Sequence, residues 1–277
     1  MSDSGWSGEQ LDLDGYLRRI GYAGDRTPTL ATLRALQAGH TAAIGFENID
    51  VLLGRGLPLD LPSLQDKLVV RGRGGYCYEQ NLLFAAALER LGFAVSGLGA
   101  RIRMGEDKLR PTTHALLKVR LDGEDWITDV GFGGEGLLAP LPLRAGHEER
   151  QGGWTFGVVR EETGPVGTWV LRSLHPEGWF DLYSFTEEPR CPADYAVFHH
   201  YIATHPHSPF VRRLVLQRPG PDLRRTLIGS ELTLTGPDFS SEKRQVTAAE
   251  LPDVAAEHFR IRLSEEDVKA LAEIYGE

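Results

Sequence analysis

The hydrophobic periodicity of this chain changes twice, and that change limits the folds it can adopt. Over residues 12–91, apolar side chains recur mostly at the spacing of amphipathic helices. Over residues 94–185, short alternating segments are separated by Gly, Pro and Asp, which is typical of β-strands and their turns. Beyond Pro189 both patterns occur, and no long polar linker marks the junctions. The sequence therefore predicts an α+β protein with a helical part, a β part and a mixed α/β part.

Several element boundaries can be predicted from capping and stop residues. A helix begins after Thr29, with leucines at helical spacing. Ser264 is expected to cap a final helix, with Asp267 at the third helical position as in a capping box. The other predicted elements are helices over 63–68, 77–91 and 198–203, strands over 116–121, 126–130 and 169–174, and paired strands over 224–234.

The composition excludes several classes of protein. The 277-residue chain has 30 Lys+Arg against 39 Asp+Glu, a formal net charge of −9, which argues against a nucleic-acid partner. Its cysteines, Cys77 and Cys191, are too few for a disulfide framework or a four-cysteine zinc site. The first residues lack the features of a signal peptide, and no segment approaches the ~20 apolar residues of a membrane span. We expect a cytoplasmic protein without a membrane partner, and the sequence leaves open whether it is a monomer or a dimer.

Cys77 lies in the segment with the strongest chemical signal. Gly74 and Gly75 precede it, and it begins a predicted helix. The amides and dipole of a helix N-terminus stabilise a thiolate, and glycines permit close approach of a substrate or another backbone. Cys77 is therefore a candidate nucleophile, the alternative being a small buried apolar residue that starts an ordinary amphipathic helix. Cys191, beside Pro192 and without a glycine approach, is expected to be a spectator.

A candidate base and its carboxylate partner lie on one predicted hairpin. His114 begins a strand that turns after Leu121 and returns to Asp129. A two-residue turn pairs Leu121 with Glu124 and a four-residue turn pairs it with Trp126, and in either register His114 and Asp129 share a face. In the first register they are diagonal neighbours about 7–8 Å apart at the backbone, within reach of each other's side chains. A turn of three or five residues would instead place them on opposite faces.

Cys77, His114 and Asp129 match the roles of a thiol nucleophile, its base and the carboxylate that orients the base. Spacing alone does not bring the helix of Cys77 against the hairpin. The same residues, however, lie in blocks that resemble the arylamine N-acetyltransferases in order and spacing, although Ile44-Gly45 stand where that family usually has a proline. The matching blocks are Phe46-Glu47-Asn48-Ile49-Asp50, Arg73-Gly74-Gly75-Tyr76-Cys77-Tyr78-Glu79-Gln80-Asn81, Thr113-His114-Ala115-Leu116-Leu117, Asp129-Val130-Gly131-Phe132-Gly133 and Thr204-His205-Pro206-His207-Ser208-Pro209-Phe210.

The resemblance implies a fold in three parts around a core like that of the cysteine proteases. The parts are an N-terminal helical bundle over 1–92, a central β-barrel-like domain over 93–190 and a C-terminal α/β lid over 191–277. It also implies Cys77, His114 and Asp129 as a catalytic triad and acetyl-CoA as cosubstrate, without a metal. The implied reaction transfers the acetyl group to the nitrogen of arylamines or hydrazines by a ping-pong route through acetylated Cys77.

The binding residues follow from the same blocks. We expect Phe46, Phe132 and Phe210 to wall a flat apolar slot for the acceptor, and we assign Thr113 to the contact with coenzyme A. Glu47 and Arg73 are expected to pair as a brace for the nucleophile loop. The basic residues Arg101, Arg103, Lys108 and Arg110 form either a solvated loop, which we favour, or a site for coenzyme A phosphates.

Two other signals are weaker. The run Gly131-Phe-Gly-Gly-Glu-Gly136 fits a dinucleotide fingerprint, but Pro140 and Pro142 forbid the helix that must follow it, so we expect a tight turn with Phe132 facing the pocket. Four histidines crowd together without the regular spacing of a zinc site, and we interpret them as part of a proline-shaped loop near the coenzyme A cleft. They are His199, His200, His205 and His207.

Three rival functions stay open at this level. An amide synthase that closes macrolactam rings on a carrier-bound polyketide would keep the fold and the triad but change the acceptor. A cysteine hydrolase or transglutaminase-like enzyme would use the same triad, with water as the acceptor in the hydrolase. A non-catalytic binding module would make Cys77 purely structural.

Overall fold

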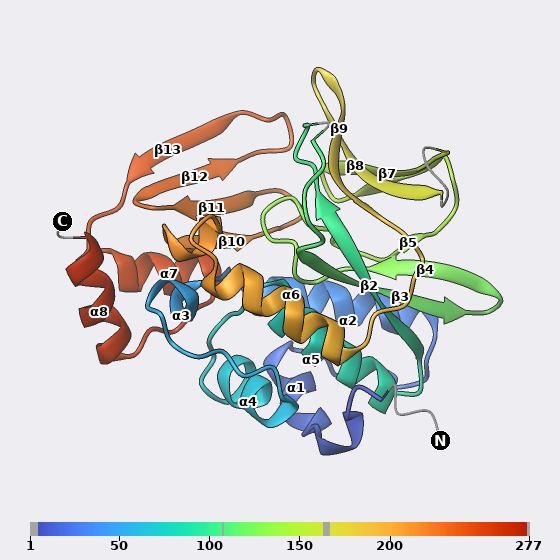
Figure 1. The fold of residues 1–277 in the computed structure, drawn as a ribbon, viewed down its shortest axis with the longest axis horizontal. Coiled ribbons are helices and arrows are strands. Elements are labelled where there is room, and N and C mark those ends of the chain that lie inside the picture. Colours follow the sequence, from blue (N-terminus) through green and yellow to red (C-terminus); the bar gives the residue numbers. More distant parts are fainter. Residues whose placement is uncertain (1–4, 107, 163–166, 276–277) are drawn as a thin grey trace.

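The computed structural model describes residues 5–106, 108–162 and 167–275. In the view of Figure 1, most helices of the first ninety residues lie beneath two antiparallel sheets. The helices are α1 (Leu13–Arg19), α2 (Leu30–Ala43), α3 (Ile49–Leu52), α4 (Leu61–Gln65), α5 (Cys77–Arg90), α6 (Pro192–Thr204), α7 (Leu251–Phe259) and α8 (Glu265–Tyr275), with short turns η1 (Gly8–Gln10), η2 (Asp66–Val70) and η3 (Pro209–Val211). The strands are β1 (Phe46–Glu47), β2 (Ala94–Ile102), β3 (His114–Leu121), β4 (Glu124–Thr128), β5 (Leu141–Pro142), β6 (His147–Gln151), β7 (Trp154–Glu161), β8 (Thr168–His175), β9 (Gly178–Phe185), β10 (Val215–Arg218), β11 (Arg224–Ile228), β12 (Glu231–Thr235) and β13 (Ser241–Gln245).

Local capping explains where the helices begin and end. The hydroxyl of Thr29 accepts a hydrogen bond from the backbone N of Thr32 at 3.2 Å, which starts α2 as predicted. Helix α5 is followed by Gly92, whose φ of +88° lies in the left-handed region that ends helices. Helix α6 begins earlier than its apolar pattern indicated, because the carboxylate of Asp194 accepts from the backbone N of Cys191 at 2.9 Å and caps it.

Capping residues also determine where helices α4 and α8 begin. Helix α4 begins at Leu61, before the predicted position, because Asp60 accepts from the backbone N of Ser63 at 3.0 Å. It then continues as the π-helical turn η2. The predicted capping box of α8 is present, since Ser264 and Asp267 exchange backbone-to-side-chain hydrogen bonds of 3.1 Å.

Helix α5 lies at the centre of the helical part. Every residue from Cys77 to Leu88 is buried, so the helix is enclosed on all sides rather than lying on the surface with one apolar face. It contacts β3 and β2 of the large sheet on one side and α1, α4 and η1 on the other. A helix buried in this way holds its N-terminal residues in a fixed position.

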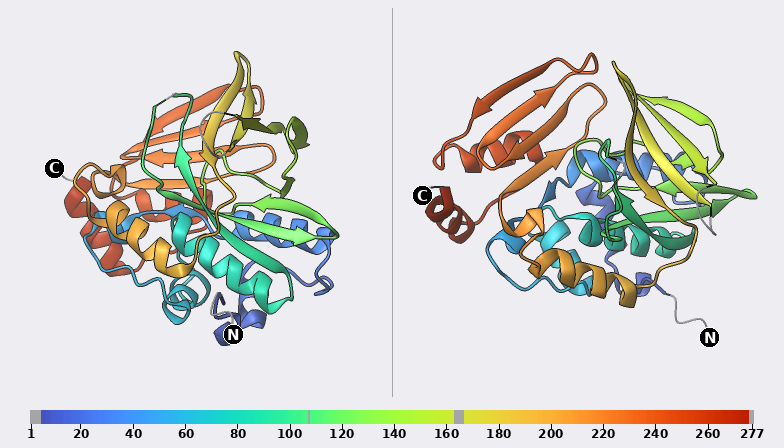
Figure 2. Two further views of the ribbon diagram at one scale, coloured as in Figure 1. Left: turned by 45° about the vertical axis from the view of Figure 1, so that its right-hand side comes forward. Right: turned by 45° about the horizontal axis from the view of Figure 1, so that its top comes forward.

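The larger sheet has the strand order β5-β4-β3-β2-β9-β8-β7-β6, with every neighbouring pair antiparallel. Figure 2 shows that it curves into a barrel-like shape beside the helices. Strand β4 ends at Thr128 and not at the predicted Val130, because Oδ1 of Asp129 accepts a hydrogen bond from the backbone N of Gly131 at 2.9 Å and turns the chain. No helix in the described part of the chain is long and apolar enough to cross a membrane.

The smaller sheet joins residues from both ends of the chain. Its order is β1-β10-β11-β12-β13, and β1 pairs with β10 through Phe46–Gln217 and Glu47–Leu216. Ile49 also packs in the apolar core beneath this sheet, with residues of α7. Residues 46–49 therefore pack against the C-terminal part of the chain. The division of the chain into three domains at 92 and 190 stays a prediction.

Candidate active site

Cys77 is the first residue of α5 and is buried, with 4% of its surface exposed. The glycines before it are required by close packing. A Cβ atom at Gly74 would lie 2.2 Å from the carbonyl oxygen of Gly45, and one at Gly75 would lie 2.9 Å from Cβ of Glu79. The nucleophile loop therefore passes directly over another backbone segment before it enters the helix, which is the role predicted for these glycines.

His114 and Asp129 meet as the hairpin argument predicts. The turn between β3 and β4 has two residues, Asp122 and Gly123, with φ of 51° and 83°, and it pairs Leu121 with Glu124. This is the first of the two registers considered. Nε2 of His114 lies 2.6 Å from Oδ2 of Asp129, and both side chains are buried.

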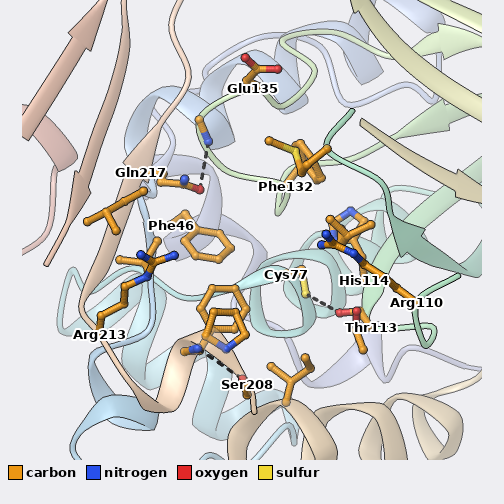
Figure 3. Close-up of a pocket in the computed structure, with 18 of the residues that line it drawn as sticks. Phe46, Cys77, Arg110, Thr113, His114, Phe132, Glu135, Ser208, Arg213 and Gln217 are labelled. Atoms are coloured by element: carbon orange, nitrogen blue, oxygen red, sulfur yellow. Dashed lines mark hydrogen bonds between the residues drawn. The ribbon is translucent and has the colours of Figure 1, made fainter. Parts of the chain in front are cut away.

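The structure also brings the hairpin against the helix, which spacing could not show. A Cβ at Gly131 would lie only 2.7 Å from Cα of Cys77, so the chain just after Asp129 packs directly on the start of α5. Sγ of Cys77 lies 3.9 Å from the carbonyl oxygen of Thr113, the residue before His114 (Figure 3). Cys77 and His114 therefore line one cleft side by side.

The carboxylate of Asp129 is surrounded by donors. Besides His114 and the amide of Gly131, it accepts from Nδ2 of Asn81 at 3.1 Å and from the hydroxyl of Tyr183 at 3.1 Å. Burial alone would raise its pKa, but the imidazole and these hydrogen bonds lower it on balance. Asp129 is thus held as an anion at neutral pH.

The contact with Asp129 raises the pKa of the His114 imidazole. Burial lowers the pKa of His114, but the carboxylate of Asp129 and then the sulfur of Cys77 raise it more, to about 10. With Nε2 bonded to Asp129, the ring nitrogen left for Cys77 is Nδ1. Asp129 therefore favours the protonated form of the ring, which lies beside the sulfur.

Three positioning residues were missed at the level of sequence. Asn81 lies one helical turn after Cys77 and also donates to the carbonyl of Ala115 at 2.8 Å, so its i+4 spacing was an available signal. Gln37 donates to the carbonyl oxygen of Asp129 at 3.4 Å, and Tyr183 bonds the carboxylate itself. Both lie on elements remote in sequence, which no spacing rule connects to the triad.

A buried ionic network holds the nucleophile loop. Nη2 of Arg73 lies 2.7 Å from Oε1 of Glu47, which confirms the predicted pair, and Nη1 lies 2.9 Å from Oδ2 of Asp267.

Lys67 forms the second part of this network. Its Nζ lies 2.7 Å from both Oε1 of Glu79 and Oδ2 of Asp50. Because Glu79 also accepts from the backbone N of Tyr76 at 3.0 Å, the network reaches the residue before Cys77.

Cys77 and His114 open onto a cleft of about 640 Å³, whose walls come from the helical, β and C-terminal parts. The four residues assigned to substrate and cofactor all line it: Phe46, Phe132, Phe210 and Thr113. Figure 3 labels three of them, Phe46, Phe132 and Thr113. The ring of Phe132 packs edge-on against His114 with centroids 5.3 Å apart, and the rings of Phe46 and Phe210 are 5.7 Å apart. These aromatic surfaces give the cleft a largely apolar interior close to the sulfur.

Polar residues also line the cleft. Of the four residues in the basic cluster, Arg110 lines it and lies 2.8 Å from Glu106, and Arg103 is paired with Glu161 and Asp181 at 2.6 and 3.0 Å. Arg213 and Gln217 also line it and were not anticipated from the sequence.

The four crowded histidines lie on two segments. His199 and His200 belong to α6 and not to the predicted loop, and Nδ1 of His199 bonds the hydroxyl of Tyr76. The rings of His205 and His207, after the helix, have centroids 5.2 Å apart, and His207 lines the cleft. Within residues 5–106, 108–162 and 167–275, no group of three metal-ligating side chains converges.

A thiol at a helix N-terminus, beside a buried His–Asp pair and open to an apolar cleft, is typical of enzymes that carry an acyl group on cysteine. Comparison with known proteins identifies the family. An N-acetyltransferase family profile matches residues 29–268. The arylamine N-acetyltransferase of Escherichia coli K12 is 38% identical over 247 residues, covering 88% of this chain and 84% of that protein.

Solved structures of arylamine N-acetyltransferases are also similar to this chain. The arylamine N-acetyltransferase of Nocardia farcinica is 49% identical with a TM-score of 0.92, covering 97% of this chain and 96% of that one. That of Mycobacterium marinum in complex with CoA is 34% identical with a TM-score of 0.87, covering 95% and 99%. The chain belongs to the arylamine N-acetyltransferase family and is an acyltransferase.

Proposed function

We propose that this enzyme transfers the acetyl group of acetyl-CoA to the nitrogen of arylamines and hydrazines, in two steps through acetylated Cys77. The observation that carries the proposal is the 2.6 Å contact between His114 and Asp129, on a hairpin whose Gly131 packs against Cys77. Family membership supplies the donor and the acceptor class, since relatives are named for arylamines and one is solved with CoA.

In the first step, the thiolate of Cys77 attacks the carbonyl carbon of the acetyl thioester. The imidazolium of His114 favours the thiolate electrostatically, and Asp129 holds the ring with Nδ1 toward the sulfur. A new carbon–sulfur bond forms to Cys77, and the bond to the sulfur of coenzyme A breaks. The departing thiolate takes the proton from His114, so coenzyme A leaves as a thiol and the imidazole becomes neutral.

In the second step, the neutral imidazole acts as the base. The amine nitrogen attacks the carbonyl carbon of acetyl-Cys77, and His114 accepts the proton that the nitrogen loses. The carbon–sulfur bond to Cys77 breaks, and the amide leaves. The enzyme returns to the thiolate and imidazolium with which it began.

The lining of the cleft supports an aryl amine or a hydrazine as the acceptor. Aromatic amines and hydrazines are largely neutral at pH 7 and retain a free electron pair, whereas alkylamines are protonated. The rings of Phe46, Phe132 and Phe210 offer a flat acceptor its apolar contacts beside the sulfur.

We propose that coenzyme A enters the same cleft. The backbone of Thr113 contacts Sγ of Cys77, and the cations Arg110 and Arg213 line the cleft from opposite sides, where they would attract phosphates (Figure 3). Residues 191–277 form one wall of the cleft through Ile202 and Val215, which fits the proposed lid.

The test is an assay of free coenzyme A released from acetyl-CoA in the presence of a panel of arylamines and hydrazines. We expect turnover that depends on the amine and an acetylated amine as product. An amide synthase would be inert with these simple amines, and a hydrolase would release coenzyme A and acetate at the same rate without them. Cys77→Ser serves as the matched inactive control.

A further inference from the structure

A second cavity, of about 440 Å³, lies apart from the catalytic cleft and shares none of its lining residues. It is formed by α2, residues 138–139, the β6–β7 hairpin and the segment from the end of β10 to the start of β11. Its floor includes apolar residues such as Ala38 and Leu138. The wall is stiffened where the backbone N of Gly153 donates to the carbonyl of Pro221 at 2.7 Å.

The pleat of the smaller sheet separates the two cavities. Along β10, Val215 and Gln217 line the catalytic cleft, and the next residue, Arg218, lines the second cavity. Arg218 pairs directly across the sheet with Arg225, which lines the same cavity. Two guanidinium groups are therefore presented side by side on this face.

Neither of these cations has a counterion in the part of the chain that the structure describes: no carboxylate there lies within the 4.0 Å ion-pair distance of Arg218 or Arg225. Only 9% of Arg218 is exposed; its Nη1 donates to the carbonyl of Ala42 at 3.3 Å, and its buried Nε has no hydrogen-bond partner. Burial, together with Arg225 and Arg260, lowers the pKa of Arg218 to about 10. A buried cation without a partner is unfavourable, so the site favours an anion.

The rest of the lining adds to the positive charge. The cavity also contains Arg34 and Arg150, against the single carboxylate of Glu149, which lies 3.3 Å from Arg34 and is already paired. Arg150 donates to the backbone carbonyl of Gly152 at 3.0 Å. The lining therefore carries an excess of positive charge in a protein whose overall charge is −9.

We propose that this cavity binds the phosphate group of a small phosphate monoester, with Arg218 and Arg225 as its main ligands. A doubly charged oxyanion matches two adjacent guanidinium groups, which bind phosphate through paired N–H donors. The volume leaves room beside the phosphate for an organic body against the apolar floor, since a water molecule occupies only ~30 Å³. The proposal does not depend on the transfer reaction.

Isothermal titration with inorganic phosphate, at constant ionic strength maintained with chloride, tests the site directly. We expect saturable binding to the wild type and at least a tenfold loss of affinity in R218Q/R225Q. R225Q alone, at a partly exposed position, should also weaken binding and provides a second variant if the double one does not fold. R213Q removes an arginine of the catalytic cleft and is the matched control, with affinity unchanged.

Repeating the titration with saturating coenzyme A separates this site from the phosphates of the cosubstrate. Binding of phosphate that persists supports an independent site, and a small phosphate monoester such as glycerol 3-phosphate should then compete with it. Loss of binding in R213Q, displacement of phosphate by coenzyme A, or an absence of saturable binding would each overturn the proposal.

Discussion

Replacing Arg73 by methionine should severely destabilise the protein, because it removes one side of a buried ionic network. Arg73 is 2% exposed and lies within 3.0 Å of oxygens of Glu47 and Asp267. Methionine keeps an apolar chain of similar length but takes the guanidinium away from these carboxylates, which are 0% and 3% exposed. Glu47 then keeps only Lys67, at 3.7 Å, and Asp267 keeps Arg55, at 2.5 Å, among the cations of the described residues. Removing one member of a buried pair typically costs about 3–5 kcal/mol, a large part of a total stability of about 5–15 kcal/mol.

The assay is reversible unfolding in urea, with thermal melting as a second measurement. At about 2–4 °C per kcal/mol for a chain of this size class, the melting temperature should fall by about 6–20 °C. Arg18→Met is the control, because Arg18 is 73% exposed and lies 3.9 Å from Asp12, and exposed pairs contribute about 0–1 kcal/mol. A loss below about 1 kcal/mol in Arg73→Met would refute the reasoning.

The pH dependence gives the same prediction a second readout. Burial would raise the pKa of Asp50 and Asp267, but the neighbouring cations, Arg73 among them, lower both on balance. A lowered carboxyl pKa stabilises the fold at pH values above the unfolded pKa of about 4, and this stabilisation is lost as the pH falls below it. The stability gap between wild type and Arg73→Met should therefore be constant near pH 7 and narrow below about pH 4.

Three further substitutions test the site. Asp129→Asn should keep the fold and lower kcat by about 10³–10⁴-fold, because an amide cannot stabilise the imidazolium or hold its tautomer. Turnover near that of the wild type would show that Asp129 is not part of the triad. Phe132→Ala should raise the KM for arylamines more than it slows acetylation of Cys77, and an unchanged KM across several amines would show that Phe132 does not contact the acceptor. Gly131→Ala places a Cβ 2.7 Å from Cα of Cys77, so it should lower the free energy of unfolding by about 1–3 kcal/mol and reduce kcat. Gly56→Ala is the control, because no atom lies within 4 Å of its new Cβ, and it should change neither quantity. Equal behaviour of the two variants would contradict the packing of the hairpin on the helix.

The relation between His114 and Asp129 was predictable because it depends on local geometry alone. Side chains alternate along a strand, so a two-residue turn is enough to place both residues on one face. The position of Cys77 at a helix start was likewise readable from the glycines before it. These are short-range rules, and they hold without knowledge of the rest of the fold.

What could not be predicted depends on contacts between distant segments. Tyr183 reaches Asp129 from β9, and β1 joins β10 across most of the chain length. Lys67 illustrates a different limit, because a lysine in a short helix is normally exposed and here is 5% exposed among carboxylates. The cavity around Arg218 has no sequence signal either, since its residues come from four separate parts of the chain.

We predict that the thiol of Cys77 is reactive although it is buried, because the imidazole of His114 lies beside it and Asp129 favours the protonated form of that ring. Iodoacetamide at about pH 6 should therefore alkylate Cys77 faster than the exposed Cys191, because only Cys77 has a histidine beside it that can take up the proton of the thiol. Prior incubation with acetyl-CoA should protect it.

The most direct test of the central claim is mass spectrometry of the peptide that contains Cys77, after incubation with acetyl-CoA in the absence of any amine. We predict one acetyl group on Cys77, its loss when an arylamine is added, and parallel initial-rate plots at several fixed amine concentrations. An unmodified peptide together with intersecting plots would show direct transfer within a ternary complex and would contradict the acetyl-cysteine mechanism.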